Sequence, residues 1–351
     1  MNAWLKQDGS LDETRIVRRE TLYTGMNGKR VERFLLVSGD SVVYKPLTND
    51  SQLGKEAWVY ANVLPHFPSI YPRLLAHSDG SGAESEVEEP DSASGELQTG
   101  ASAVSHSGES LEAIEPWCLF EDLGPLSHAF DERIVSELIL HMAAWHALPV
   151  EALLDAPLLG PKPMIDVLLR DVYARKEELR RALSDLPAGV ELVERVLADG
   201  DIMPPGWMKR VQSHGDLHLG NYTFVNGEIK VLDWEHVHLN SPYWDLYHVL
   251  DLSHPVFPKP ADAKVRERML DLYVQESAVR GIVYDPAAFK GEYARFSAVF
   301  SLWMLLLIEK DLASLAVSHI PAKWSPEQLQ RQRKETRDSL VQCAAMLPPL
   351  Q

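Results

Sequence analysis

The first part of the chain alternates apolar and polar residues in short runs, a pattern typical of half-buried β-strands. It predicts strands over residues 15–23, 30–37 and 41–46, separated by the turn-forming stretches TGMNG and SGD. A helix is predicted over residues 49–67, because apolar residues recur there at helical spacing. These residues are Leu53, Ala57, Tyr60, Ala61 and Leu64.

Apolar runs predict two more strands, over residues 70–78 and 115–124, and helical periodicity dominates after residue 125. The predicted helices cover residues 126–147, 163–185, 188–199, 243–252, 260–280, 286–318 and 325–346. The exception is YTFVNGEIKVLDW, which alternates on both sides of Asn226-Gly227 and therefore predicts a β-hairpin. A chain of 351 residues exceeds one typical core, so we expect an α+β fold with two lobes. Residues 1–121 would form a small, β-rich lobe with one main helix, and residues 122–351 a larger, mostly helical lobe.

One segment, residues 78–113, differs from the rest of the small lobe in composition. It is rich in Ser, Gly and Glu, has no aromatic residue and contains few aliphatic ones. Such a segment buries too little apolar surface to offset the entropy lost on ordering. We therefore interpret it as a disordered acidic insertion that carries no catalytic role; a regulatory tether is the alternative.

The net charge of −17 argues against nucleic acid as the main partner. Much of it lies in residues 79–115, which hold ten acidic residues and no lysine or arginine. The longest apolar stretch, 298–308, is far short of the roughly 20 residues that a membrane span needs. The polar first ten residues predict no leader peptide, and only two cysteines occur. Together these features predict a cytoplasmic protein without a membrane partner.

The stretch HGDLHLGN (214–221) and the VLDW that ends the predicted hairpin place several polar groups close together. Asp216 and Asn221 lie in the loop, and the hairpin returns the chain so that Asp233 emerges beside them. Carboxylate and amide oxygens suit Mg²⁺ that is shared with phosphates. One carboxylate beside such a metal could orient and deprotonate a hydroxyl, as in phosphoryl transfer.

Zinc is the alternative for the same stretch, because His214 and His218 are four residues apart and two further histidines follow. Paired histidines at this spacing bind metal from one face of a helix. Gly215 and Gly220 disfavour a helix here, so we favour the phosphoryl-transfer interpretation.

The pattern H-x-D-x-x-x-x-N, followed by a hairpin and D-W, resembles the aminoglycoside phosphotransferase and choline kinase family of small-molecule kinases. The resemblance implies a bilobal, protein-kinase-like fold. It also implies that His214 braces the loop, that Asp216 is the catalytic base, and that Asn221 and Asp233 bind Mg²⁺. Asp245-Leu246 matches the family's structural D-L that opens the next helix.

The resemblance extends to the small lobe. Lys45 in VVYKPL occupies the place of the family's phosphate-binding lysine, and Glu56 in GKEAWVY that of its partner. The segment WCLFEDLG resembles the strand between the lobes, where the backbone of Glu121 to Leu123 would hold adenine and Phe120 would flank it. The loop over the phosphates would lie in LYTGMNGKRV, which departs from the full glycine-rich pattern.

These residues imply an ATP- and Mg²⁺-dependent phosphotransferase with a small-molecule hydroxyl acceptor. The acidic larger lobe favours a cationic acceptor, such as an aminoglycoside, choline or an amino alcohol. The candidate acceptor-side residues are His218, Glu235, Glu309 and Asp311. The alternative is a catalytically inactive kinase-fold protein that binds a nucleotide or a partner. The sequence leaves open which acceptor is used, which hydroxyl receives the phosphate and what biological role the protein has. It also leaves open whether ATP or GTP is the donor and what the oligomeric state is.

Overall fold

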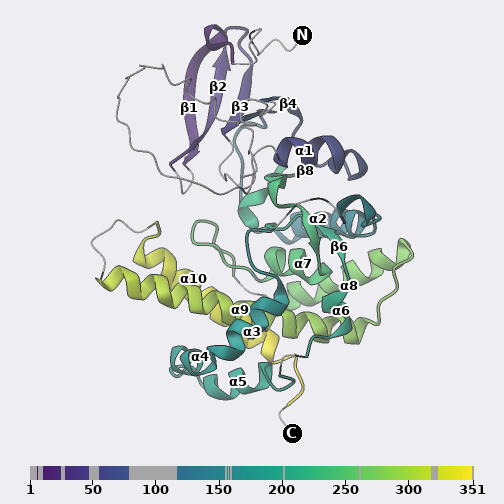
Figure 1. The fold of residues 1–351 in the computed structure, drawn as a ribbon, viewed down its shortest axis with the longest axis vertical. Helices are drawn as coiled ribbons and strands as arrows, with labels where there is room; N and C mark the ends of the chain where they lie inside the picture. Colours follow the sequence, from purple (N-terminus) through teal and green to yellow (C-terminus); the bar gives the residue numbers. More distant parts are fainter. Residues whose placement is uncertain are drawn as a thin grey trace, which may run out of the picture. The chain divides into compact units, whose positions relative to one another are not determined.

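The protein divides into two compact units, each built from two stretches of chain. The smaller comprises Met1–Gly54 and Leu74–Asp122, and the larger comprises Lys55–Arg73 and Leu123–Gln351. The chain passes from the smaller to the larger unit for the last time after Asp122, one residue beyond the boundary predicted from the sequence. The computed structural model (Figure 1) describes residues 6, 11–24, 28–46, 55–78, 117–154, 156, 158, 160–200, 202–260, 262–317 and 323–349. The proposed insertion 78–113, apart from Ser78, and part of the proposed phosphate loop lie outside the described residues.

The smaller unit is an antiparallel sheet of five described strands in the order β1-β2-β3-β5-β4. Its strands are β1 (Ile16–Thr24), β2 (Arg30–Leu36), β3 (Ser41–Pro46), β4 (Leu74–His77) and β5 (Trp117–Glu121). All five overlap strands predicted from the alternating pattern. One face buries a cluster that includes Phe34, Trp117 and Leu119. Asp122, just after β5, accepts hydrogen bonds from Arg33 Nε at 2.5 Å and Ser41 Oγ at 2.6 Å, which ties β5 to β2 and β3.

The larger unit is mostly helical, which confirms the α+β class. Its helices are α1 (Lys55–Asn62), α2 (Glu132–His146), α3 (Ile165–Ala174), α4 (Lys176–Ala182), α5 (Gly189–Val196), α6 (Pro205–Met208), α7 (Pro242–Leu250), α8 (Ala263–Val279), α9 (Pro286–Val317) and α10 (Pro326–Ala344). The hairpin of β7 (Tyr222–Val225) and β8 (Glu228–Val231) turns at Asn226-Gly227, both at positive φ, as predicted. The pair β6 (Val211–Ser213) and β9 (His238–Asn240), together with α6, was not predicted.

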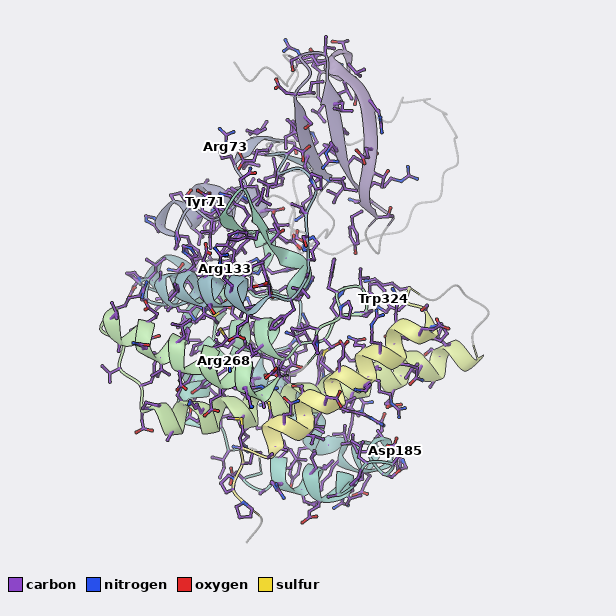
Figure 2. All side chains as sticks on the ribbon, turned by 180° about the vertical axis from the view of Figure 1, so that it is seen from behind. Tyr71, Arg73, Arg133, Asp185, Arg268 and Trp324 are labelled. Atoms are coloured by element: carbon purple, nitrogen blue, oxygen red, sulfur yellow. The ribbon has the colours of Figure 1, made fainter. Side chains whose placement is uncertain are left out.

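The helices of the larger unit pack around one extended hydrophobic core. Along this core, α9 lies against α10, and α2 lies against α8 (Figure 1). At the surface of the α2–α8 pair, Arg268 donates to both carboxylate oxygens of Glu132 (Figure 2). In the part of the chain that the structure describes, no helix combines the length and hydropathy of a membrane span.

The buried carboxylate of Asp251, at the end of α7, joins four helices. It accepts hydrogen bonds from Arg266 of α8, Tyr293 of α9 and Ser339 of α10, the last at 2.6 Å. Burial alone would raise the pKa of Asp251, but the Arg266 guanidinium and these hydrogen bonds lower it to about 2. An aspartate in the unfolded chain titrates near 3.8. The ionised form therefore stabilises the fold above about pH 4, and this stabilisation is lost as the pH falls towards 2.

We predict that Asp251→Asn lowers the free energy of unfolding at pH 7 by about 3–5 kcal/mol, because it leaves the Arg266 charge buried without its counter-ion. Urea unfolding followed by circular dichroism would measure this loss, and the gap to the wild type should narrow between pH 4 and pH 2. Asp338→Asn, at an exposed pair with Lys334 on α10, is the matched control and should change the free energy by less than about 0.5 kcal/mol. Equal effects of the two substitutions would contradict this role of Asp251.

Candidate active site

The loop between β6 and the short helix Leu219–Asn221 carries the H-x-D-x-x-x-x-N stretch, and its two glycines make its conformation possible. Gly215 has φ of +89°, and a Cβ there would lie 2.1 Å from the carbonyl oxygen of His236. At Gly220, a Cβ would lie 2.3 Å from the ring of Phe257. The backbone therefore approaches two neighbouring segments too closely for any side chain.

The fully buried Asp245 of α7 holds the start of this loop. Its carboxylate accepts hydrogen bonds from the backbone N–H of His214 (2.8 Å) and of Gly215 (3.2 Å) and from Ser213 Oγ (2.7 Å). His146 of α2 supplies a fourth contact, with Nε2 at 3.1 Å. Burial would raise the pKa of Asp245, but these donors, His146 first among them, hold it well below its usual range. An ionised carboxylate therefore fixes the loop.

His214 lies beneath the loop, where the family resemblance placed a brace. Its Nε2 donates to the carbonyl of Leu232 at 2.8 Å, and its Nδ1 accepts from the N–H of Asp216 at 3.3 Å. The ring also packs on Trp234, with centroids 4.6 Å apart. Burial lowers the pKa of His214, so the ring is neutral at pH 7 and can accept at one nitrogen while it donates at the other.

Asp216 faces a lysine that no sequence motif singled out. Lys162 Nζ lies 2.5 Å from Asp216 Oδ1, and His248 Nε2 lies 3.6 Å from the same oxygen. His218 Nε2 lies 3.8 Å from Oδ2. Burial would raise the pKa of Asp216, but the positive charge of Lys162 holds it well below its usual range. The carboxylate is therefore ionised at neutral pH and can accept a proton.

Asn221 and Asp233 lie on neighbouring segments of chain. The amide nitrogen of Asn221 donates to the carbonyl of Asp216 at 2.8 Å, which leaves its amide oxygen as a possible metal ligand. The N–H of Leu232, next to Asp233, donates to the Asn221 carbonyl at 2.8 Å. Asp233 itself has left-handed backbone angles (φ +63°, ψ +57°), a strain that often accompanies functional positions.

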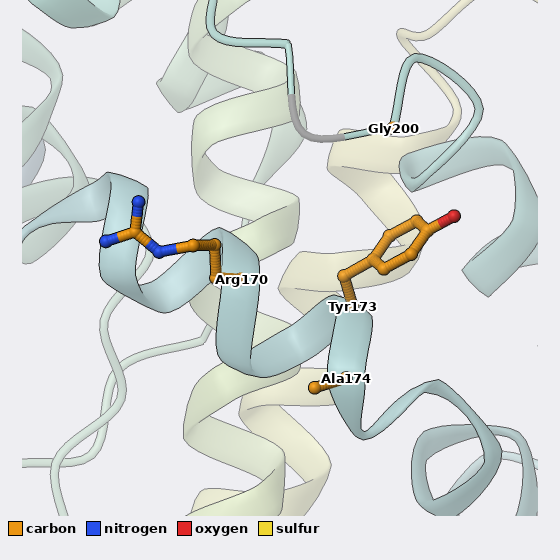
Figure 3. A pocket seen from close by; sticks show the side chains of 4 residues that line it. All are labelled: Arg170, Tyr173, Ala174 and Gly200. Carbon is orange, nitrogen blue, oxygen red and sulfur yellow. The ribbon is translucent and has the colours of Figure 1, made fainter.

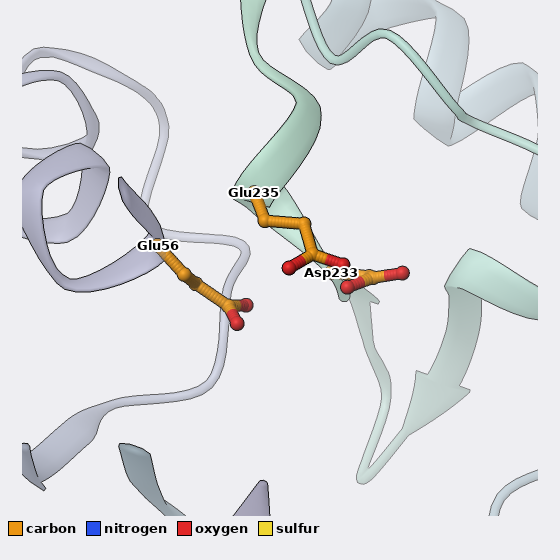
Figure 4. A group of neighbouring side chains, drawn as sticks. All are labelled: Glu56, Asp233 and Glu235. Carbon is orange, nitrogen blue, oxygen red and sulfur yellow. The ribbon is translucent and has the colours of Figure 1, made fainter. Parts of the chain in front are cut away.

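Three carboxylates converge at Asp233. Oxygens of Glu56 from α1, Asp233 and Glu235 lie within 4.8 Å of one another. Figure 4 shows these three side chains as neighbours. Glu56 and Glu235 are almost fully buried. Hard oxygen donors at this spacing suit a divalent cation such as Mg²⁺. Glu235, considered an acceptor-side residue from sequence, thus lies with the acids around Asp233, and so does Glu56.

A group of partly exposed rings is in contact with His218, which lies 3.8 Å from Asp216. His218 stacks on His254 with centroids 4.6 Å apart, and both rings pack on Phe257. Trp324, just before α10, meets His254 edge-on, and Lys323 lies over the face of Trp324 (Figure 2). Burial lowers the pKa of His218 to about 4 and of His254 to about 3, so both rings are neutral at pH 7. We call these four side chains, His218, His254, Phe257 and Trp324, the ring group.

The smaller unit holds most of the residues predicted for the nucleotide. Lys45 lies in β3 opposite Cys118 of β5, and Phe120 and Glu121 lie in the same β5 strand. Phe120 is buried, and Leu123 follows β5 at the start of the larger unit's second stretch. The sheet register therefore places Lys45 and the predicted adenine-binding segment on adjacent strands.

The two late acidic candidates have different surroundings. Glu309 of α9 forms an ion pair with Arg333 of α10 at 2.5 Å, and Arg337 lies 3.8 Å away. Asp311 is exposed on the same helix. Lys162, His248 and His254 were missed as site residues because no local motif contains them. A signal was present only for His248, which lies one turn after the predicted Asp245-Leu246.

A separate surface pocket of about 270 Å³ is lined by Arg170, Tyr173, Ala174 and Gly200 (Figure 3). None of its four lining residues belongs to the H-x-D-x-x-x-x-N loop, to the three acids Glu56, Asp233 and Glu235, or to the ring group. Its lining offers a guanidinium and a phenol but no carboxylate or imidazole. We assign it no part in the chemistry.

The antiparallel sheet, the mostly helical larger unit and the H-x-D-x-x-x-x-N loop are those of a protein-kinase-like fold. Residues 100–282, more than half of the chain, match the phosphotransferase enzyme family. The chain belongs to this family, which also contains the aminoglycoside phosphotransferases that the sequence resembles. No curated protein matches the sequence.

Solved structures show the same fold at low sequence identity. Macrolide 2′-phosphotransferase from Brachybacterium faecium is 17% identical, with 93% of each chain covered and a TM-score of 0.52. Choline kinase from Cryptosporidium parvum is 11% identical, with 97% of this chain and 92% of that chain covered and a TM-score of 0.51. A variant of aminoglycoside 2′-phosphotransferase IIIa, solved with GDP, is 13% identical, with 94% and 93% covered and a TM-score of 0.54.

Proposed function

We propose that this phosphotransferase moves the γ-phosphate of ATP, with Mg²⁺, to a hydroxyl group of a small molecule. The observation that carries the proposal is the braced loop, which presents an ionised Asp216 beside Asn221 and the acids around Asp233. This arrangement provides a base and oxygen donors for a metal, as kinase-type phosphoryl transfer requires. The family and the kinase-like fold support the same reaction class.

In this proposal each group has one task. Asp216 orients the acceptor hydroxyl and takes its proton as the new O–P bond forms and the bond to ADP breaks. His214 keeps Asp216 in place through the backbone. Asn221 and Asp233, with Glu235 beside them, would hold Mg²⁺, which would supply positive charge to neutralise the phosphates. The proposed nucleotide-binding residues are Lys45, Glu56, Phe120, Glu121 and Leu123.

The charges near Asp216 bear on the class of acceptor. The overall negative charge favours a cation, but exposed charges farther than about 8–10 Å are largely screened at physiological salt. Close to Asp216 lie the cation Lys162 and His218 of the ring group, and Lys323 lies over Trp324 at the other end of that group. We therefore propose a hydroxyl compound with a planar or apolar part and few positive charges, ahead of the polycationic aminoglycosides. His218 would face this acceptor.

The base is tested by Asp216→Asn, which keeps the shape of the side chain but removes its capacity to accept a proton. We expect turnover to fall about 10²- to 10⁴-fold while the Kd for MgATP stays within about threefold. A coupled assay of ADP release would measure the loss of turnover, and calorimetry would measure the unchanged Kd for MgATP. Asp271→Asn, at an exposed pair with Lys290, is the control and should keep full activity. Full activity of Asp216→Asn would refute the assignment of the base.

The acceptor class is tested by a screen of ADP release against four groups: aromatic alcohols, uncharged sugars, choline-like amines and aminoglycosides. The charges near Asp216 predict the highest kcat/KM for ring-bearing acceptors without several positive charges. Trp324→Ala should then raise the KM for the best acceptor and leave the Kd for MgATP unchanged. A clear preference for aminoglycosides would contradict the local-charge argument and restore the cationic acceptor that the net charge favours.

The alternative, an inactive kinase-fold protein that binds nucleotide or a partner, is less well supported. The sequence carries Asp216, Asn221 and Asp233, and Lys45 lies in the strand β3, as predicted. A protein without catalytic activity would not need an ionised Asp216 in a loop that also fixes the side chain of Asn221. The same ADP-release screen distinguishes the enzyme from the inactive protein, because an inactive protein would bind MgATP without transferring phosphate to any acceptor.

A further inference from the structure

Lys162 is the cation closest to the proposed base among the described residues, and it comes from a part of the chain outside the family's loop. It lies in the segment before α3, and its Nζ is 2.5 Å from Asp216 Oδ1. A second contact joins Nζ to His248 Nε2 at 3.3 Å. With 18% of its side chain exposed, Lys162 is held between α7 and the catalytic loop instead of extending into solvent.

The ring of His248 is arranged to receive this lysine. Its Nδ1 lies 2.8 Å from the carbonyl of Trp244, which can only accept, so Nδ1 carries the proton. Nε2 is then a lone-pair acceptor that points at the ammonium of Lys162. His248 is fully buried and packs against Trp244 and Phe300, so its ring cannot turn easily. The backbone of α7 thereby fixes the position of the Lys162 ammonium.

The two oxygens of Asp216 are consequently not equivalent. Oδ1 accepts a charged hydrogen bond from Lys162, whereas Oδ2 accepts none from the residues that the structure describes. His218 Nε2 lies 3.8 Å from Oδ2, beyond hydrogen-bond distance. Oδ2 is therefore the oxygen available to an incoming hydroxyl.

We propose that Lys162 is a positioning residue for the transfer reaction: anchored on His248, it orients the carboxylate of Asp216 so that Oδ2 receives the acceptor proton. The proposal rests on the proposed function of Asp216 as the base. Lys162 takes no part in bond making or breaking, and the reaction still moves one proton to Asp216 and one phosphoryl group from ATP to the acceptor oxygen. Other charged or titratable groups near Asp216 are His214, His218, Asp233, His248 and His254.

Loss of the lysine should affect the rate of transfer more than nucleotide binding. A misplacement of a reacting group by about 1 Å can cost on the order of 10²-fold in rate. We therefore expect Lys162→Met to lower kcat about 10²-fold and to leave the KM and Kd for MgATP within about threefold. The probe is MgATP alone, with water as the acceptor and ADP release as the readout.

Two further variants separate positioning from general loss of stability. Lys162→Arg keeps a cation that can bond Oδ1 and should recover at least about tenfold of the activity that Lys162→Met loses. Lys176→Met removes a lysine of similar exposure that pairs with Glu194 at 2.6 Å, away from the catalytic loop, and should keep full activity. Wild-type activity of Lys162→Met, or equal losses in Lys162→Met and Lys176→Met, would overturn the proposal.

A double-mutant cycle tests the pair without any turnover. Melting temperatures of the wild type, Lys162→Met, Asp216→Asn and the double variant should be non-additive by about 2 °C or more, because the two groups interact directly. Additive shifts would show that the pair does not form and would overturn the role of Lys162. If the wild type neither hydrolyses MgATP nor phosphorylates any acceptor, the proposed function fails, and the cycle still decides whether Lys162 holds Asp216.

Discussion

The buried carboxylate of Asp245 is the constraint on which the active-site geometry depends. An ionised group with no solvent contact is tolerated only when donors surround it, and here two of the donors are backbone N–H groups of the catalytic loop itself. Satisfying Asp245 therefore imposes a loop conformation, and Gly215 must adopt a positive φ to meet it. Because His214 and Gly215 are fixed in this way, the positions of Asp216 and Asn221, which follow them in the loop, are fixed as well. The Trp244 indole adds a further hydrogen bond, to the Gly215 carbonyl at 2.7 Å.

Two sets of groups with opposite electrostatic character adjoin this loop. Glu56, Asp233 and Glu235 concentrate negative charge and oxygen donors, which suits a cation that arrives with a nucleotide. Asp216 instead lies against Lys162, with His248 Nε2 at 3.6 Å and His218 Nε2 at 3.8 Å. Burial lowers the pKa of both imidazoles, so both are neutral at pH 7. A base surrounded in this way remains an anion and does not repel a neutral acceptor. The net charge of −17 does not reflect the local charge around Asp216 or around Asp233, so it is a poor guide to the charge of the acceptor.

Features determined by neighbouring residues could be predicted from the sequence. Asn226-Gly227 required a two-residue hairpin, and the spacing from Asp216 to Asn221 and Asp233 by itself indicated a kinase-type loop. Features that depend on distant segments could not be predicted. The strands β6 and β9 have three residues each, too few for a periodic pattern, and they exist because each pairs with the other across 24 residues of chain. Lys162 and His254 carry no motif of their own, and only the packing of distant segments brings Lys162 to Asp216 and His254 to His218. The placement of α1 with the larger unit likewise follows from its contacts with the Trp234–His236 turn, not from its sequence.

We propose that the acids around Asp233 hold a magnesium-bound nucleotide next to the braced loop. Isothermal titration calorimetry of ATP, with Mg²⁺ and with excess chelator, tests it most directly when the wild type is compared with Asp233→Asn. We expect the wild type to bind ATP at least about tenfold more tightly with Mg²⁺, and Asp233→Asn to lose this difference because one metal ligand is gone. Equal affinity with and without Mg²⁺ in the wild type, or an undiminished Mg²⁺ effect in Asp233→Asn, would contradict the claim.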